Sequence, residues 1–277
     1  MKRLSALLFC IGFSFLTIPQ QMNAQTSYGW EIGFWGGLSS YYGDLNPVFS
    51  FRRLGPTAGV FARKNFDGRV CLRFGGSWGN VGGNDATSPN AFEQARNLNF
   101  NSNVFEGAVV LEFNFQNFHS RRPREDKPVS PYLLAGFGIT HFNPKSEYKG
   151  GNYFLRDLGT EGQARGEEYA LVTPAMIAGF GLKIDMNPSW SWNIEISNRF
   201  TFTDYLDDVS GTYADYRTVA GYHGDAAGGL SDRSLEVGDV RIGERGRQRG
   251  NAKNKDMYIF ASIGLAYRFV SVGCPAY

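Results

Sequence analysis

Few residues of this 277-residue chain have the types and spacing that chemistry requires. Its three histidines, His119, His141 and His223, fall in three separate segments, so no two of them have the H-x-x-x-H spacing of a metal site. His141 and Ser146 form a Ser–His pair beside a strand end, but no third residue orients them as nucleophile and base. We therefore expect no enzyme, no metal and no cofactor.

The last long segment between strands carries two groups of charges that could bind ions. Asp204, Asp207, Asp208 and Asp215 could offer oxygen ligands to calcium, but their spacing departs from an EF-hand, and a solvated acidic loop is the alternative. A glycine-rich stretch at 226–230 predicts mobility. The basic residues of this segment could contact the phosphates of lipopolysaccharide or be merely hydrated: Arg241, Arg245, Arg247, Arg249, Lys253 and Lys255.

Composition limits the elements that could position such residues. The chain has 35 glycines and 15% aromatic residues, with a formal charge of +2 and a mean hydropathy of −0.30. This mixture is too polar for a bundle of membrane helices and too aromatic for disorder. The near-neutral charge also argues against a nucleic-acid partner. A single β-rich body is the expectation.

The N-terminus has the layout of a secretory signal peptide. Lys2 and Arg3 precede an apolar run from Leu4 to Ile18, and Ala24 provides a small residue for cleavage. We assign residues 1–24 to the signal peptide and 25–277 to the exported protein.

Eight segments alternate apolar and polar residues, and each can cross an outer membrane as a tilted strand. In the fourth, Phe105, Val109 and Leu111 share one face while Glu106 and Glu112 share the other. The segments are Tyr28–Leu45, Thr57–Phe66, Arg69–Gly79, Phe100–Phe115, Pro131–Phe142, Leu171–Met186, Trp190–Asp204 and Asp256–Val270. This pattern predicts an all-β fold, a closed eight-stranded antiparallel transmembrane barrel.

The connections alternate in length, which is typical of outer-membrane barrels with short periplasmic turns and long external loops. Asp67-Gly68 and 187–189 are short, whereas 116–130 is longer than a turn needs. The predicted external loops are 45–56, 80–99, 143–170 and 205–255. An even number of strands leaves both termini in the periplasm, so we expect an integral outer-membrane protein in contact with lipid and lipopolysaccharide.

An eight-stranded barrel is too narrow for a pore because side chains fill it. Its inward positions carry both signs of charge, which predicts an internal salt-bridge network, since unpaired charges away from water are costly. The expected members are Glu31, Arg63, Arg73, Glu106, Glu112, Lys183, Glu195, Arg199 and Arg268.

Two segments on the predicted periplasmic side could contact a partner. The 116–130 insert carries Arg121, Arg122, Arg124 and Lys127, which could dock onto an acidic protein surface or be solvated. The tail 271–277 contains Cys274. A bond from Cys274 to a partner, a bond to Cys71, and two free thiols all remain open.

Three segments resemble the PorG family of Bacteroidetes outer-membrane barrels. They are EIGFWGGLSSYYGDL at 31–45, GPTAGVFAR at 55–63 and SNRFTFTDYLDDVS at 197–210, and the resemblance extends over nearly the whole exported chain. It implies a component of the type 9 protein secretion system that associates with a periplasmic ring made from a lipoprotein and its partner. The expected function is therefore a non-enzymatic membrane anchor or assembly factor. The alternative is a small OmpA-like structural or adhesive barrel acting through its external loops.

Overall fold

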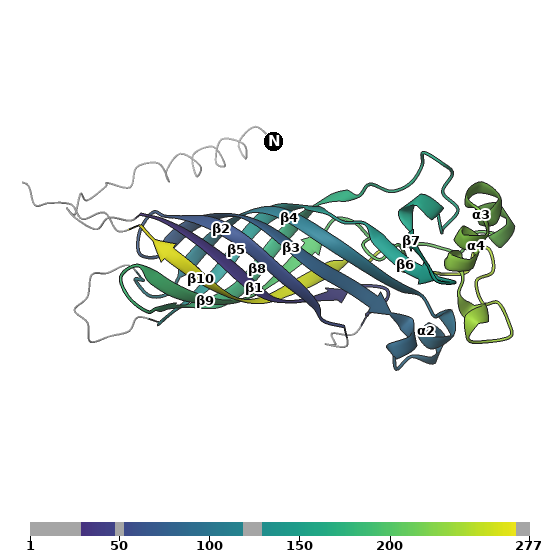
Figure 1. Ribbon diagram of the computed structural model, residues 1–277, viewed down its shortest axis with the longest axis horizontal. Helices are drawn as coiled ribbons and strands as arrows, with labels where there is room; N and C mark the ends of the chain where they lie inside the picture. Colours follow the sequence, from purple (N-terminus) through teal and green to yellow (C-terminus); the bar gives the residue numbers. More distant parts are fainter. Residues whose placement is uncertain (1–28, 48–52, 119–128, 270–277) are drawn as a thin grey trace, which may run out of the picture.

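The protein is a long β-barrel with a folded cap at one end (Figure 1). The computed structural model describes residues 29–47, 53–118 and 129–269. Within them, eight strands pair in the order β3-β2-β1-β10-β9-β8-β5-β4, and β3 pairs with β4 to close the ring. The predicted closed eight-stranded antiparallel barrel is confirmed. Its strands are β1 (Trp30–Tyr42), β2 (Gly55–Asn65), β3 (Val70–Asn84), β4 (Asn99–Asn114), β5 (Val129–His141), β8 (Val172–Asp185), β9 (Trp190–Thr201) and β10 (Met257–Arg268).

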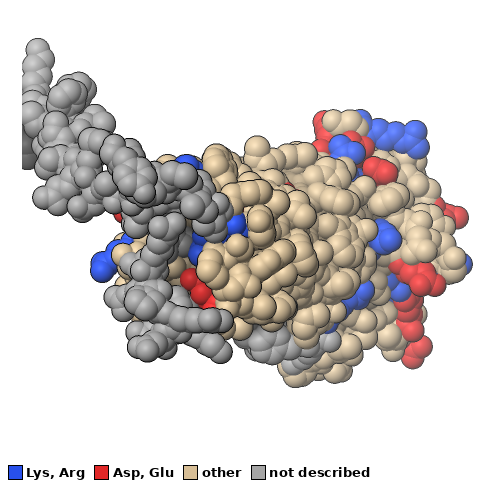
Figure 2. Space-filling view, turned by 60° about the vertical axis from the view of Figure 1, so that its left-hand side comes forward, with Lys and Arg blue, Asp and Glu red and all other residues tan. Residues whose placement is uncertain are grey.

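Side chains alternate between the two faces of the wall, as the sequence pattern predicts. In β4, Phe105, Val109 and Leu111 are 53%, 45% and 51% exposed, whereas Glu106 and Glu112 are buried in the lumen. The wall visible in Figure 2 is mostly uncharged between its two ends. A charged lumen inside an apolar outer surface is the arrangement of an outer-membrane barrel.

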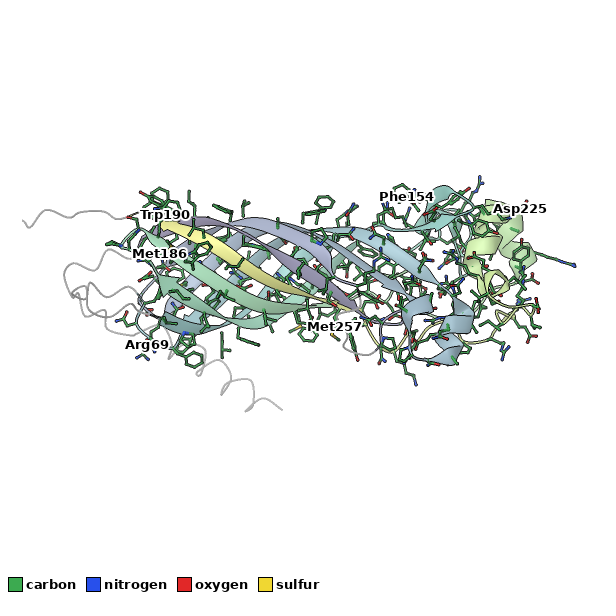
Figure 3. All side chains as sticks on the ribbon, turned by 60° about the horizontal axis from the view of Figure 1, so that its bottom comes forward. Arg69, Phe154, Met186, Trp190, Asp225 and Met257 are labelled. Carbon is green, nitrogen blue, oxygen red and sulfur yellow. The ribbon has the colours of Figure 1, made fainter. Side chains whose placement is uncertain are left out.

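Short turns connect the strands at one end, which we call the turn end. Asp67 accepts hydrogen bonds from the backbone of Arg69 and Val70 there, and Asn187 accepts them from Ser189 and Trp190. Asp and Asn favour such tight reversals because their side chains satisfy backbone amides nearby. Figure 3 shows Arg69, Met186 and Trp190 at this end and Phe154 and Asp225 at the opposite one.

The long connections fold into a second layer of structure at the other end (Figure 1). We call residues 85–98, 142–171 and 202–256 the cap. The glycine-rich stretch 226–230, predicted to be mobile, lies instead in a helix that buries Ala227 and Leu230. The cap contains η1 (Asp85–Thr87), α2 (Ala91–Arg96), β6 (Pro144–Tyr148), β7 (Gly151–Phe154), η2 (Arg156–Leu158), α3 (Tyr216–His223), α4 (Asp225–Ser231) and η3 (Ser234–Glu236).

One hydrophobic core joins the cap to the barrel. Tyr41 and Phe260 enter it from the strands, and Phe142, Leu206 and Leu230 enter it from the cap. The ring centroids of Tyr41 and Phe100 lie 4.8 Å apart, edge to face. The cap and the adjoining half of the lumen are therefore packed as one body.

The predicted signal peptide (1–24), most of the basic insert and the C-terminal tail lie outside the described residues. No helix in the described part of the chain is long and apolar enough to span a bilayer.

Candidate functional site

The lumen near the turn end is organised around one carboxylate. Glu112 lies 2.6 Å from the Lys183 ammonium, 2.9 Å from Arg63 Nε and 3.2 Å from Arg73 Nη1. Glu112, Arg63 and Lys183 are completely buried. Three cations around one anion would be unstable alone, so the remaining cationic charge needs further carboxylates.

Those carboxylates come from neighbouring strands. Arg63 also contacts Glu31 at 2.8 Å, and Glu31 continues to Arg268 at 2.9 Å. Arg73 contacts Glu195 at 2.7 Å. Nearer the cap, Arg199 pairs with Glu106 at 3.1 Å. The structure thus pairs all nine charged residues expected in the lumen.

Two tyrosines and one aspartate of this network were not predicted from the sequence pattern. Tyr132 donates a hydrogen bond to Glu195, Tyr258 donates one to Glu106, and Asp185 pairs with Arg268 at 3.1 Å. The sequence signal for these residues was only that each one falls at an inward-facing position in the alternation of its strand. These groups add hydrogen bonds and an ion pair to the charged network, so buried, paired side chains lie between the strands along the lumen.

A buried carboxyl pair lies where the barrel meets the cap. The Tyr41 hydroxyl is 2.6 Å from Asp207 Oδ2 and 2.7 Å from Asp256 Oδ1. The hydroxyl has one hydrogen to donate, so a second proton must sit on one of the carboxyls for both contacts to be hydrogen bonds. Burial raises the pKa of Asp207 and of Asp256 well above the ordinary range.

Two more acidic residues of this region are buried, contrary to a solvated acidic loop. Burial raises the pKa of Asp204 to about 7, and its Oδ2 has no hydrogen-bond partner among the described residues. Burial also raises the pKa of Asp208 to about 6, although Arg249 opposes the shift. Asp215 instead caps α3 by accepting from the Arg217 amide.

These aspartates do not assemble a calcium site. No group of three or more His, Cys, Asp or Glu side chains in the described ranges is arranged to hold a metal ion. The partners of the carboxylates are tyrosines, a threonine hydroxyl, backbone amides and an arginine.

Arg249 is an internal cross-link of the cap and not a rim residue. Its guanidinium lies 3.2 Å from Glu161 and 3.5 Å from Asp208, and it is buried. Arg241 stacks 3.8 Å above the ring of Tyr216. Arg245, Arg247, Lys253 and Lys255 are exposed, as either interpretation of the basic segment requires.

The Ser–His pair is not brought together. His141 is exposed on the outer face of the wall beside Phe105. Ser146 is buried, donates to Asn99 Oδ1 at 2.7 Å and accepts from Arg233 at 3.0 Å. His223 contacts the Gln163 carbonyl in the cap.

The residues expected to contact a partner are not covered by the described ranges. Arg121, Arg122, Arg124, Lys127 and Cys274 all lie outside them. Cys71 is a buried thiol in the lumen, 3.9 Å from Lys183 Nζ and 3.4 Å from Asn114 Nδ2.

Solved outer-membrane barrels are similar to this chain in fold. The attachment invasion locus protein Ail of Yersinia pestis, solved with the heparin analogue sucrose octasulfate, has 10% sequence identity and a TM-score of 0.41; the match covers 87% of this chain and 99% of Ail. Neisserial surface protein A has 10% identity and a TM-score of 0.43, covering 88% and 100%. OprG of Pseudomonas aeruginosa has 8% identity and a TM-score of 0.38, covering 88% and 98%.

Among curated proteins, none has a sequence that matches this chain significantly. The sequence model of one family, described as "Domain of unknown function (DUF6089)", matches residues 4–223. That match spans most of the chain, including seven of the eight barrel strands and part of the cap. The protein therefore belongs to the DUF6089 family.

Proposed function

We propose that this protein is a non-enzymatic anchor in the outer membrane for the periplasmic ring of a type 9 secretion system. The observation that carries the proposal is the lumen, where buried ion pairs centred on Glu112 and the core around Phe260 occupy the interior. A barrel built in this way offers its wall to lipid and its two ends to partners.

The proposed orientation places the turn end in the periplasm and the cap outside the cell, because outer-membrane barrels keep short turns periplasmic and long loops external. β1 begins and β10 ends at the turn end, where the Phe269 amide donates to the Trp30 carbonyl. In this orientation both termini and the β4–β5 connection, with its four basic residues, face the periplasm.

Two further observations support a ring partner. The segments 31–45, 55–63 and 197–210 resemble the PorG family, whose members associate with such a ring. The β4–β5 connection at the turn end is also longer than a hairpin needs, because 14 residues (115–128) separate the two strands. A basic insert of that length suits an acidic protein surface.

The test is affinity purification from native outer membranes. One variant replaces Arg121, Arg122 and Arg124 with serine, and a second ends after Phe269. The matched control replaces three exposed cap cations, Arg245, Lys253 and Lys255, with serine. Loss of ring components from the first two variants and retention in the control are expected. Full ring recovery and secretion with both turn-end variants would refute the proposal.

Phe118 must be kept in any deletion of the insert. It is buried, with Lys183 Nζ 5.8 Å and the Arg268 guanidinium 5.4 Å from its ring. A deletion of residues 119–127 therefore tests the contact without opening the lumen.

A second candidate is a structural or adhesive barrel that acts through its cap. The packing of the cap favours it, since Leu206 and Leu230 are buried in the same core as Tyr41. A rigid external surface can present a binding site with little ordering cost. Under this alternative, changes in the cap impair function and changes at the turn end do not.

A further inference from the structure

A polar cleft opens on the side of the cap, where Arg53 just before β2, the cap-side ends of β3 and β4, the β6–β7 hairpin and the segment before η3 meet. Its volume is about 530 Å³, within the range of roughly 300–1,000 Å³ typical of small-molecule sites. The residues that matter for its chemistry are Arg53, Asn84, Asn99, Lys145, Lys149 and Arg233.

The cleft is cationic. Four basic residues line it against a single acidic residue, Glu147. In the described structure, neither Arg53 nor Lys145 has a carboxylate within ion-pair distance. Arg233 is the one cation of the set that is paired, with Glu236 at 2.8 Å. The positive charge is therefore available to a ligand.

The amides of the cleft present donors. Asn99 Oδ1 accepts from Ser146, which in turn accepts from Arg233, and Asn84 Oδ1 accepts from the Ala86 amide. Each of these bonds uses the side-chain oxygen, and among the described residues neither side-chain nitrogen donates a hydrogen bond. Donors and cations together suit a ligand rich in acceptors and negative charge, such as a phosphorylated saccharide.

The position of the cleft relative to the apolar outer face indicates where such a ligand would come from. On the outer face of the wall, Trp78 of β3 is paired with Phe105 of β4. The next outward-facing positions toward the cap are asparagines on both strands. Asn80 and Asn101 form a reciprocal amide pair at 2.8–2.9 Å there. Asn101 is four residues above Phe105, about 13 Å of strand at ~3.3 Å per residue. The cleft thus begins about 13 Å toward the cap from this aromatic pair, on the flank of the protein.

A second hollow of about 320 Å³ adjoins the cleft and shares Lys149 and Arg233 with it. It adds Arg241, which stacks on Tyr216, as a further cation. Asp232 and Glu236 also line this second hollow, and Glu236 is the carboxylate paired with Arg233. The two hollows together therefore extend the site along the cap as a polar surface of mixed charge with more cations than acids. A site of this extent fits a chain of sugars better than one small anion.

We infer that this cleft binds the phosphorylated saccharide headgroup of a glycolipid in the outer leaflet. The inference goes beyond the anchor function and does not depend on ring binding. It does rest on the proposed orientation of the cap.

The probe is the deacylated, phosphate-bearing core oligosaccharide of lipopolysaccharide, titrated by calorimetry into the full exported protein in detergent. The test variants are Lys145→Ser with Lys149→Ser, and Asn99→Asp. The latter is isosteric, keeps an oxygen for Ser146 and replaces the amide donor with an acceptor. Each should weaken binding about tenfold, the effect of losing a charge-assisted hydrogen bond.

The matched control replaces Arg245 and Lys253, two exposed cap cations outside the cleft, with serine. It should change affinity by no more than about twofold, as expected for screened surface charges. Dephosphorylated core should also bind about tenfold more weakly. Heat-modifiable migration on a gel checks that each variant is folded.

Three outcomes would overturn the inference. The first is unchanged binding in both cleft variants, or an equal loss in the control. The second is inorganic phosphate binding as tightly as the core, which would mean a small-anion site. The third is an epitope inserted after Arg245 that antibodies cannot reach on intact cells. Ring recovery by the cleft variants is measured in parallel and should be normal, which separates this test from that of the anchor function.

Discussion

Replacing Asp256 with asparagine should remove much of the pH dependence of cap stability. In the native protein Asp256 Oδ1 lies 2.7 Å from the Tyr41 hydroxyl, and Asp256 Oδ2 accepts from the Leu206 amide. An asparagine amide nitrogen at the first position would donate to the Tyr41 oxygen, and Tyr41 would donate to Asp207. The variant therefore keeps every hydrogen bond without requiring a bound proton.

The magnitude follows from the proton that the carboxyl pair holds. Since burial raises the pKa of Asp207 and Asp256, the native state binds a proton that the unfolded chain has released above about pH 4. Stability is then full below about pH 4 and falls as the pH rises. Because pH 7 is about 3 pH units above the ordinary pKa of aspartate, holding the proton there costs at most about 4 kcal/mol. Asp256→Asn should stabilise the cap by up to that amount at pH 7 and by little at pH 4.

Hydrogen exchange of segment 204–256 in detergent, from pH 5 to pH 8, measures the free energy of cap opening. Asp204, whose pKa is raised to about 7, contributes a second part of the slope. Asp204→Asn with Asp256→Asn should therefore remove most of the slope above pH 6 and leave below it the part from Asp208, whose pKa is raised to about 6. Asp239→Asn, at an exposed site of the cap, is the control and should behave as wild type. A flat profile for the wild type, or an unchanged slope in the double variant, would refute the reasoning.

Three further outcomes are expected. Glu112→Gln should lower the free energy of unfolding of the barrel in urea by about 3–5 kcal/mol because it leaves buried cations unpaired. The control Glu244→Gln, on the surface, should change this free energy by less than about 0.5 kcal/mol. Equal urea midpoints for the two variants would contradict the prediction. Arg249→Met should make the cap sensitive to protease while the barrel stays heat-modifiable, since it leaves two buried carboxylates without their cation; a resistant cap would show that this cross-link is dispensable. Cys71 should resist maleimide until the barrel is unfolded, because its thiol is buried in the lumen; rapid labelling of folded protein would show an open interior.

The barrel was predictable because alternation decides which side chains face the lumen. In a ring of eight strands the interior is narrow, so inward charges such as Glu112 and Arg63 must meet. Their pairing was less accessible, since the stagger between strands determines that Glu112 contacts three cations while Glu106 contacts one. A pattern of period two carries no information on stagger.

The cap was not predictable for a different reason. Its α-helices have six to eight residues, too few to form on local propensity alone, and α4 contains two glycines. They are held by tertiary packing on the barrel rim, which leaves no periodic signature. For the same reason Arg249 and Asp208 resembled solvated loop charges, although burial in the cap pairs them.

The hydrophobic core that runs from the lumen into the cap limits how the loops of this barrel can be exchanged. Surface-display engineering usually treats such loops as independent of the scaffold. Here, replacing segment 202–256 would remove Leu206, Val209 and Leu230 from the core that contains Tyr41 and Phe260. Water would then reach the cap end of the barrel lumen. Foreign peptides should be tolerated only at exposed bends such as the one at Arg245 and Gly246, where no core contact is lost.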